Sequence, residues 1–441
     1  MLYSPLSLEQ ALAIKDAALD VLASAGVRVM GVPGGVLQEF QNAGCTIHGD
    51  RVYIPVDVTL SALASAPQHV VLYSRDKSHN LPLVPGLIYF GTGALVTEII
   101  DLDSGRRRPS TQEDVSNFAR LAQRIDDIDY LQIVCTPNDV PPAEAQLYKW
   151  RGSLPHTTKH VIGGVESPEQ AHVLLEEASS LDTVGGSLFA EPFLSLVACV
   201  LSPLTLDPST IACVDVFARH GLPVVSSVMA LAGATSPCRL MGTLVQTLAE
   251  SLSQLVYCQI VNPGTPVLLG CVSASMDMRY GTPVAGGPEL ALLSAYSAQM
   301  AQQLRIPYYG TGGTTSSFVP DLQAGAEKML TGLLTALAGA NLVHDMVGLL
   351  GNLSLASYEQ VVIDSEIVAM IRRVVGGIQG NPQNQSQYIS RLALSGDYLR
   401  DEETVRHCRT ELWHPVIMAR RSGEEDIVAK ARGRVREILG F

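Results

Sequence analysis

The sequence predicts an α/β protein: a TIM-type (β/α)8 barrel with an N-terminal α+β cap and a C-terminal helical tail. The chain has 441 residues, which is enough for one large barrel with an added domain. Hydrophobic residues make up 47% of it and charged residues only 17%, which indicates a large core. From Ser110 onward, short apolar runs alternate with longer helical patterns. Seven such units are legible and residues 87–102 supply an eighth, which favours a closed barrel over an open doubly wound sheet.

The predicted cap covers residues 1–85. Ser7-Leu-Glu-Gln10 resembles a capping box, and leucines then recur at helical spacing up to Gly26. The stretch Cys45–Pro55 predicts a hairpin with Gly49-Asp50 at its turn. We also expect strands at 27–30 and 69–74 and helices at 36–42 and 57–65.

The predicted barrel domain covers residues 86–378, and its elements follow the alternation of apolar runs and helical patterns. Its strands are expected at 87–90, 130–134, 159–162, 194–201, 223–228, 266–271, 306–309 and 342–343. Its helices are expected at 111–124, 143–151, 168–180, 209–220, 237–261, 288–303, 321–337 and 358–375. The tail, residues 379–441, is polar, is predicted to end in a charged helix at 424–439, and is expected to pack on the outside of the barrel.

Charge and cysteine usage exclude several classes of protein. The net charge of −13 argues against a nucleic-acid binder, because phosphate contact needs clustered Lys and Arg. The eight cysteines form no CxxC pair, which is typical of buried free thiols in a reducing compartment. The start of the chain lacks a signal-peptide pattern, and the apolar windows 193–206 and 329–351 are too short or too interrupted to span a membrane. We expect a cytoplasmic protein, and the weakly charged surface favours a homo-oligomer.

The stretch from Arg305 to Asp345 organises the barrel. A short apolar run leads into a Gly/Thr/Ser loop, a long helix follows, and a second apolar run ends in His344-Asp345. The carboxyl ends of barrel strands carry the chemistry, so we expect the Gly310–Thr315 loop and His344 to be neighbours on one active face. Gly310-Thr-Gly-Gly313 matches neither dinucleotide nor P-loop spacing. It predicts either a close-packed turn or a place where a ligand approaches the backbone.

Metal and serine-hydrolase chemistry have weak support. The ten histidines show no HxxEH-type spacing. His344 and Asp345 offer two ligands for a metal, but no further ligand can be named, and a histidine at a strand end is more often a hydrogen-bonding pocket residue. No G-x-S-x-G motif is present. The serines at predicted strand exits have no assignable base and suit hydrogen bonding to a substrate: Ser202, Ser227, Ser273 and Ser275.

Aromatic residues are only 5% of the chain, yet several fall at the predicted barrel mouth. They plug the mouth or form a cage for a cation, which an aromatic face attracts by roughly 0.5–2 kcal/mol. Methionines in similar exit loops predict an apolar, polarizable wall. The aromatic residues are Tyr89, Phe90, Tyr280, Tyr308, Tyr309 and Phe318, and the methionines are Met229, Met276 and Met278.

Many short motifs resemble the trimethylamine methyltransferase (MttB) superfamily, in the family's order over about residues 8 to 420. They include Ser202-Pro-Leu-Thr-Leu-Asp207, Gly221-Leu-Pro-Val-Val225, Ala232-Gly-Ala-Thr-Ser-Pro237, Met276-Asp-Met-Arg279 and Pro320-Asp-Leu-Gln-Ala-Gly325. Others are Gly49-Asp-Arg-Val52, Tyr89-Phe-Gly91, Asp101-Leu-Asp-Ser-Gly105, Ala338-Gly-Ala-Asn341 and Ser357-Tyr-Glu359. No motif is decisive alone, but their joint occurrence is specific.

The resemblance implies an enzyme that moves a methyl group from a methylated amine to the Co(I) cobalamin of a separate corrinoid protein. The founding members contain pyrrolysine, whereas this sequence has only standard residues. It therefore resembles the non-pyrrolysine branch, which is glycine betaine methyltransferase-like and acts on quaternary amines. Where the family pattern often has Asp-Ser/Ala-Lys, this chain has Ser316-Ser-Phe318, so the resemblance leaves the substrate open.

The chemistry implied by the resemblance is an SN2 displacement that needs no metal and no protein nucleophile. A quaternary ammonium is already an activated leaving group, so the enzyme positions its substrate in line and excludes water. We assign no catalytic residue, and we expect aromatic faces and oxygens, rather than one counterion, to hold the cation. A betaine carboxylate would be bound by the 312–315 amides and hydroxyls or by His344. The predicted substrate-binding residues are Tyr89, Phe90, Ser202, Met229, Met276, Tyr309, Gly312, Gly313, Thr314, Thr315 and His344.

Two other functions remain open from the sequence. One is a metal-dependent barrel lyase or hydrolase that uses His344 and Asp345. The other is a quaternary-amine binding protein that does no chemistry.

Overall fold

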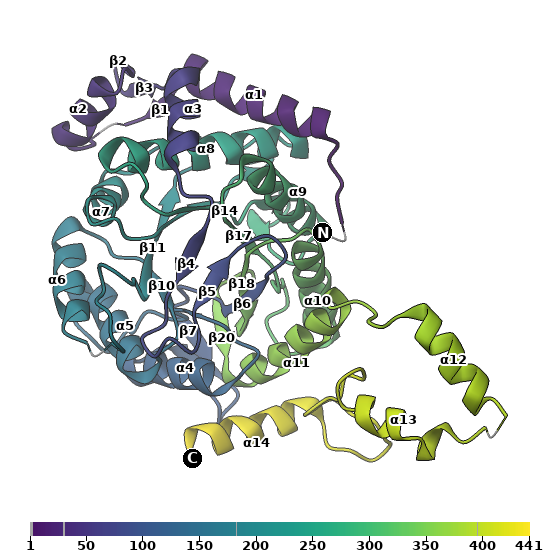
Figure 1. The fold of residues 1–441 in the computed structure, drawn as a ribbon. Helices are drawn as coiled ribbons and strands as arrows, with labels where there is room; N and C mark the ends of the chain where they lie inside the picture. The colour runs from purple at the N-terminus through teal and green to yellow at the C-terminus, as the bar shows by residue number, and fades with distance from the viewer. Residues whose placement is uncertain (1–2, 30, 182, 395) are drawn as a thin grey trace.

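The computed structural model describes residues 3–29, 31–181, 183–394 and 396–441. Within them, eight parallel strands form one sheet in the order β6-β18-β17-β14-β12-β11-β10-β9. A parallel bridge between Gly91 and Tyr130 joins the two end strands, so the sheet closes into a barrel. Helices surround it, as the ring in Figure 1 shows. The predicted (β/α)8 barrel is confirmed.

Each barrel strand is followed by a helix, and most bounds lie within a few residues of those predicted. The strands are β6 (Tyr89–Thr92), β9 (Leu131–Gln132), β10 (Val161–Gly163), β11 (Leu194–Val200), β12 (Val224–Val228), β14 (Val267–Cys271), β17 (Tyr308–Thr311) and β18 (Leu342–Val347). The helices are α4 (Gln112–Arg124), α5 (Ala145–Ser153), α6 (Pro168–Ser179), α7 (Pro208–Arg219), α8 (Leu240–Val261), α9 (Pro288–Leu304), α10 (Leu322–Leu337) and α11 (Tyr358–Val375). Short strands decorate the loops: β7 (Glu98–Ile100), β8 (Arg107–Pro109), β13 (Leu231–Ala232), β15 (Ala274–Asp277), β16 (Thr282–Val284), β19 (Leu349–Leu350) and β20 (Leu355–Ser357).

Local sequence explains where many barrel helices begin. A side-chain oxygen accepts a hydrogen bond from a backbone N–H of the first turn, which satisfies a donor that has no partner within the helix. Five barrel helices are capped in this way, by Thr111, Ser167, Asp207, Asp321 and Ser357.

The N-terminal region has two parts with different roles. The capping box at Ser7 and Gln10 starts α1 (Leu8–Ser24), which packs on α8. The predicted hairpin is present as β2 (Thr46–His48) and β3 (Arg51–Tyr53), beside β1 (Val27–Arg28). Helices α2 (Gly34–Asn42) and α3 (Val56–Ser65) complete this part. The second part is a hairpin of β4 (Val70–Leu72) and β5 (Leu81–Leu83), which crosses one end of the barrel in Figure 1.

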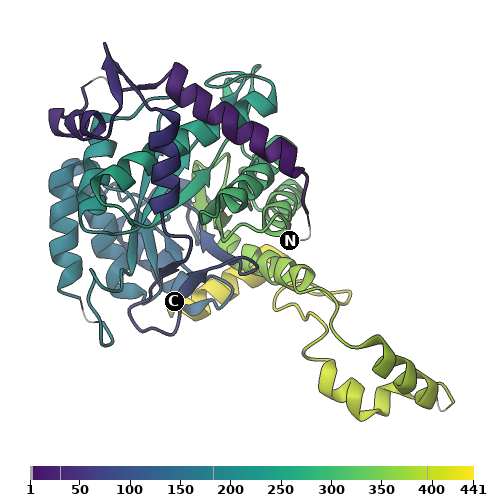
Figure 2. The same cartoon turned by 45° about the horizontal axis from the view of Figure 1, so that its top comes forward.

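The C-terminal tail also has two parts, one packed on the barrel and one extending away from it. Helix α14 (Ile427–Leu439) packs on α11 and α4. By contrast, α12 (Pro382–Leu392) and α13 (Glu402–His407) extend away from the barrel and bury none of their described residues (Figure 2). The structure therefore differs from the sequence prediction for α12 and α13. None of the helices in the described ranges is long and apolar enough to cross a membrane.

Two strands run further than the apolar pattern predicts. Strand β17 continues through Gly310 and Thr311, and β18 continues from Val343 through His344 to Val347. The first residues added to each strand are polar or glycine: Gly310 and Thr311 in β17, and His344 and Asp345 in β18. They interrupt the hydrophobic pattern, although β18 then continues through the apolar Met346 and Val347.

Candidate active site at the barrel mouth

The barrel interior has an apolar layer at the end covered by the β4–β5 hairpin. Its residues form one cluster with Val70, Leu72, Leu81 and Leu83 of the hairpin. Side chains two residues apart on a strand point to the same side, so the next inward layer toward the mouth can be read from this one. The apolar layer comprises Tyr130, Ile162, Val197, Val225, Leu268, Tyr309 and Leu342. The layer above it comprises Gln132, Gly164, Cys199, Ser227, Gly270, Thr311 and His344, and it is polar or open.

His344 is held firmly in this upper layer. Its ring stacks on Tyr309 with centroids 3.7 Å apart and an interplanar angle of 10°. The Thr311 hydroxyl donates to the Cys271 carbonyl at 2.8 Å and lies 2.8 Å from Nε2 of His344. Because the hydroxyl proton is used on the carbonyl, Nε2 is assigned as the donor to Thr311. Of the Gly310–Thr315 loop, which was expected to neighbour His344, Thr311 lies directly against the His344 ring.

Asp345 has an unusual backbone and an unpaired side chain. The pairing of β18 with β6 shifts between Val343 and Val347, and Asp345 within this bulge has φ +58°. Left-handed backbone is uncommon for a residue other than glycine and clusters at functional sites. The side chain is only 7% exposed. Its Oδ2 lies 3.0 Å from Nδ1 of His344, but the two are not aligned as a hydrogen bond, and the described residues give the carboxylate no other partner.

The charge of Asp345 acts on groups from three other strands. Burial raises the pKa of the Tyr130 and Tyr309 phenols well above 10, and the Asp345 charge adds to both rises. Burial also raises the pKa of the Cys199 thiol, again with a contribution from Asp345. The carboxylate therefore faces two neutral phenols and a neutral thiol across the mouth.

Several buried polar atoms of the two barrel layers have no partner among the described residues. They are the hydroxyls of Tyr130 and Tyr309, Oε1 of Gln132 and Nδ1 of His344. Buried polar groups are almost always hydrogen-bonded, so a group of unpaired ones beside an unpaired carboxylate indicates a place for a ligand. Aromatic faces, oxygens and one negative charge suit an organic cation.

The remaining predicted loop residues face away from the mouth. A Cβ on Gly312 would lie 2.7 Å from the Val343 side chain, and one on Gly313, at φ +66°, would lie 2.5 Å from the Met346 backbone. The Thr314 hydroxyl donates to the Ala285 carbonyl, and the Thr315 hydroxyl donates to Glu327, both at 2.6 Å. The glycines thus let the strand-to-helix turn pack closely, and the side chains of Thr314 and Thr315 are used within that turn; the predicted role of residues 312–315 in substrate binding stays a prediction.

Tyr89 and Phe90 also lie elsewhere, because β6 begins at Tyr89 instead of ending there. The Tyr89 hydroxyl donates to the Pro82 carbonyl of β5 at 3.3 Å, at the covered end of the barrel. Phe90 is buried on the outer side, where its ring lies 5.0 Å from the Arg372 guanidinium carbon. Both were expected at the mouth, and that placement is wrong.

Ser202, Met229 and Met276 lie in segments beyond the strand ends on the mouth side. The Ser202 hydroxyl donates to Oε2 of Glu250 at 2.6 Å, and Glu250 also accepts from the Leu204 N–H, so this serine braces the loop after β11. Met229 follows β12 and is 39% exposed, and Met276 is half-buried in β15. The methionines keep their predicted position at the rim.

The sequence analysis did not assign Tyr130, Gln132, Cys199 or Asp345 to substrate binding, although it named Ser227. Tyr130, Gln132 and Cys199 are inward residues of the barrel, and alternation within each strand is the signal that marks them. The described residues contain no group of three or more His, Cys, Asp and Glu side chains arranged to hold a metal ion.

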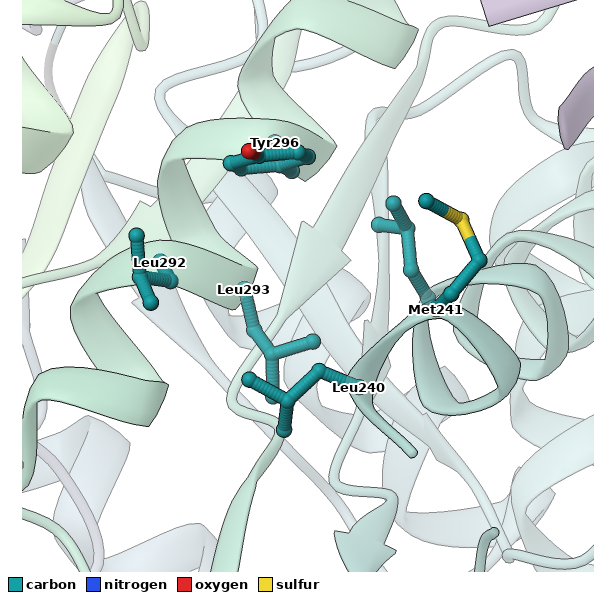
Figure 3. Close-up of a pocket in the computed structure, with 6 residues that line it drawn as sticks. Leu240, Met241, Leu292, Leu293 and Tyr296 are labelled. Atoms are coloured by element: carbon teal, nitrogen blue, oxygen red, sulfur yellow. The ribbon is translucent and has the colours of Figure 1, made fainter. Parts of the chain in front are cut away.

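A separate apolar groove lies outside the barrel. Side chains from the first turn of α8 and from α9 face one another across it, as Figure 3 shows. Its volume is about 190 Å³, and it is lined by Leu240, Met241, Leu244, Leu292, Leu293 and Tyr296. It has no charged group and is unsuited to a cation.

A closed (β/α)8 barrel with a polar, partly unpaired site at its strand ends defines a TIM-barrel enzyme. The family model described as "Trimethylamine methyltransferase (MTTB)" matches residues 1–440. The chain therefore belongs to this family, a family of methyltransferase enzymes.

Named relatives agree with this assignment. The chain is 32% identical over 409 residues to trimethylamine methyltransferase MttB of Desulfitobacterium hafniense strain DSM 10664 / DCB-2, covering 91% of this chain and 81% of the relative. It is 30% identical to glycine betaine methyltransferase of D. hafniense strain Y51, covering 98% and 91%. It is 31% identical to trimethylamine methyltransferase MttB of Methanosarcina thermophila, covering 98% and 92%.

Among solved structures, the monomethylamine methyltransferase MtmB of Methanosarcina barkeri matches with a TM-score of 0.53. The identity is 12%, and the match covers 84% of this chain and 79% of that one. At this identity the likeness supports the barrel fold alone.

Proposed function

We propose that the chain moves a methyl group from a quaternary amine, glycine betaine or a related betaine, to the Co(I) cobalamin of a cognate corrinoid protein. The proposal is supported above all by the buried Asp345 carboxylate, which contacts Nδ1 of His344 at 3.0 Å without an aligned hydrogen bond and lies near the unpaired hydroxyls of Tyr130 and Tyr309. The relatives include both trimethylamine and glycine betaine methyltransferases, so family membership supports a methylated amine without choosing between them.

A quaternary ammonium has no N–H, so it cannot be recognised by donating hydrogen bonds. Its recognition depends on charge and on contact with aromatic faces and oxygens. Asp345 supplies the charge, and the Tyr130 ring and hydroxyl supply a face and an oxygen. The ring of Tyr130 has its space because position 91 is glycine: a Cβ there would lie 2.2 Å from the ring. In this respect the proposal departs from the sequence expectation, which gave the cation no counterion.

The residues present also suit a reaction that depends on positioning. Bound cobalamin supplies the Co(I) nucleophile, and this chain binds the cation, directs one methyl group out of the mouth and excludes water on the covered side. The leaving group is a neutral tertiary amine, so no residue has to donate a proton. Exposed apolar side chains in the loops of the mouth suit contact with a partner protein: Met229, Met278, Tyr280 and Phe318.

Binding of the cation is tested by titration calorimetry of the purified chain with glycine betaine, γ-butyrobetaine, choline and trimethylamine. We expect one quaternary amine to bind and trimethylamine to bind at least tenfold more weakly, because trimethylamine lacks the acid group of a betaine. Equal affinity for all four compounds would contradict the quaternary-amine part of the proposal.

Treatment with a chelator should leave methyl transfer unchanged, because the step requires no metal bound to the chain. Transfer is measured before and after dialysis of the chain against EDTA, with the methyl acceptor added afterwards. A loss of activity that Zn²⁺ or Mg²⁺ restores would instead support the metal-dependent alternative.

A further inference from the structure

A second cavity lies beside the mouth, at the carboxyl ends of β10 and β11. Its volume is about 350 Å³, and the walls that matter here come from Thr97, Thr136, Lys149, Gly164 and Cys199. Cys199 lies at the border between the cavity and the mouth, because it lines the cavity and also belongs to the upper barrel layer, where the Asp345 charge contributes to its raised pKa. The cavity and the cation site therefore share Cys199 as a common wall.

The feature that distinguishes this cavity is Lys149 of α5, which is only 1% exposed. Three lysines are buried in the described ranges, and the other two, Lys159 and Lys328, each have several hydrogen-bond or ion-pair partners. Lys159 donates to the carbonyls of Ala122, Ile125 and Ile128 at 2.6–3.0 Å. Lys328 donates to the Gly313 carbonyl and forms an ion pair with Asp364. Lys149 has a single partner, the side-chain oxygen of Gln146.

An ammonium group has three donors, and a buried cation without a counterion is costly. The charges near Lys149 do not remove this cost. Glu166 is exposed and accepts a hydrogen bond from the Gln146 amide at 2.8 Å. The Gln146 side chain therefore stands between the Glu166 carboxylate and Lys149. Burial raises the pKa of both Cys199 and Cys213, the latter to about 12, so the thiols that line the cavity are neutral.

We propose that Lys149 makes this cavity the anion subsite of the substrate site, which takes the acid group of a methylated amino acid whose ammonium group lies against Asp345. The proposal rests on the proposed function and adds a specificity-determining residue to it. The hydroxyls of Thr97 and Thr136 are the further donors that line the cavity. Charge-assisted hydrogen bonds from one buried ammonium and neighbouring hydroxyls are the usual way to hold a carboxylate. Lys149 thus fills the role that the sequence prediction gave to residues 312–315.

The test is the variant Lys149→Met, which keeps the length of the side chain and removes the charge. Each betaine is compared with its carboxamide, which has the same ammonium group but no negative charge. For glycine betaine and γ-butyrobetaine, we expect KM to rise about 10- to 100-fold in Lys149→Met, while KM for the carboxamides changes less than twofold. A variant that lost affinity equally for acids and amides would overturn the proposal.

Thermal unfolding of the same variant separates function from structure. Replacing a poorly paired buried charge by an apolar side chain is often neutral or stabilising. We therefore expect the Tm of Lys149→Met to equal or exceed that of the wild type. A lower Tm together with unchanged acid-over-amide selectivity would show that Lys149 is structural, and would overturn the proposal.

Thr136→Val gives an independent variant should Lys149→Met fail to fold. It removes one hydroxyl from the cavity, and we expect a two- to tenfold rise in KM for the betaines alone. An unchanged acid-over-amide preference in Thr136→Val would count against the subsite.

The pH dependence provides a further check. Burial lowers the pKa of Lys149 to about 8, and the charge of Glu166 partly offsets this. The protonated lysine binds the carboxylate, so KM for a betaine should rise as the pH passes through 8, while KM for its carboxamide stays level. Lys149→Met should remove this pH dependence, and its persistence in the variant would contradict the proposal.

The two proposals can fail separately. If the wild type transfers methyl groups from betaine and carboxamide equally well, the subsite is wrong and the proposed function stands. If the wild type neither binds nor demethylates any of these compounds, the proposed function fails, and the subsite fails with it.

Discussion

Asp345→Asn is expected to raise KM for the quaternary amine more than 100-fold. At about 5 Å and an effective dielectric constant of about 20, the attraction between a carboxylate and a cation is worth about 3 kcal/mol. Asparagine is nearly isosteric and tolerates left-handed backbone, so it should keep the conformation that Asp345 adopts at φ +58°. The loss of affinity for the quaternary amine would then reflect the loss of the negative charge alone. We would measure it from the initial rate of methyl transfer and by calorimetry.

A ligand of the same shape without the positive charge provides the control for this variant. In 3,3-dimethylbutanoate a carbon atom replaces the nitrogen of glycine betaine, so the carboxylate remains and the positive charge is gone. Asp345→Asn should bind this isostere as well as the wild type does, or better. Equal KM values for the quaternary amine in wild type and variant would remove Asp345 from the site.

Lys328→Met is expected to cost about 3–5 kcal/mol of unfolding free energy, the largest stability effect that we predict. Lys328 and Asp364 form an ion pair of 3.0 Å, and both side chains are fully buried. Removing the lysine leaves the Asp364 carboxylate buried without its cation. The same pair also holds two loops at the barrel mouth. Lys328 donates to the carbonyl of Gly313, which follows β17, and Asp364 accepts from the N–H of Gly348, which follows β18.

Urea denaturation checks this prediction, with a surface lysine as the matched control. Lys77 pairs with Glu191 at 3.0 Å, but both groups are partly exposed, so Lys77→Met should cost less than about 1 kcal/mol. The double variant Lys328→Met with Asp364→Leu should recover part of the loss, since it no longer buries a lone charge. The prediction fails if Lys328→Met is no more destabilising than Lys77→Met.

The order of the barrel elements could be predicted from the sequence, because its parallel strands are buried on both faces and appear as apolar runs between helices. Strand ends were less predictable. Polar residues or glycine interrupt the hydrophobic pattern after Tyr309 and after Val343, whereas β17 continues to Thr311 and β18 to Val347. A pattern based on burial in an apolar core cannot follow a strand into a polar interior.

The candidate site was predictable in part. Tyr309 and His344 stand at recognisable strand ends on neighbouring strands, so their meeting follows from the βα order. A glycine-rich turn is ambiguous, since close packing and ligand approach need the same residue, and only the contacts of Gly312 and Gly313 decide between them. Tyr130 reaches the site because β9 closes the ring beside β6, and Lys149 reaches the cavity from a helix. Both placements depend on how distant parts of the chain pack together in three dimensions.

Methyl transfer to cob(I)alamin under anaerobic, reducing conditions, followed by the cobalamin absorbance, is the decisive assay for the proposed reaction. The compounds are glycine betaine, proline betaine, carnitine, γ-butyrobetaine, choline and trimethylamine. We expect methylcobalamin from a quaternary amine, none from trimethylamine, and a rate at least 100-fold lower with Asp345→Asn at subsaturating substrate. Transfer from trimethylamine alone would contradict the assigned substrate. Tight binding of a quaternary amine without transfer, even when the corrinoid protein is supplied, would make the chain a binding protein and not an enzyme.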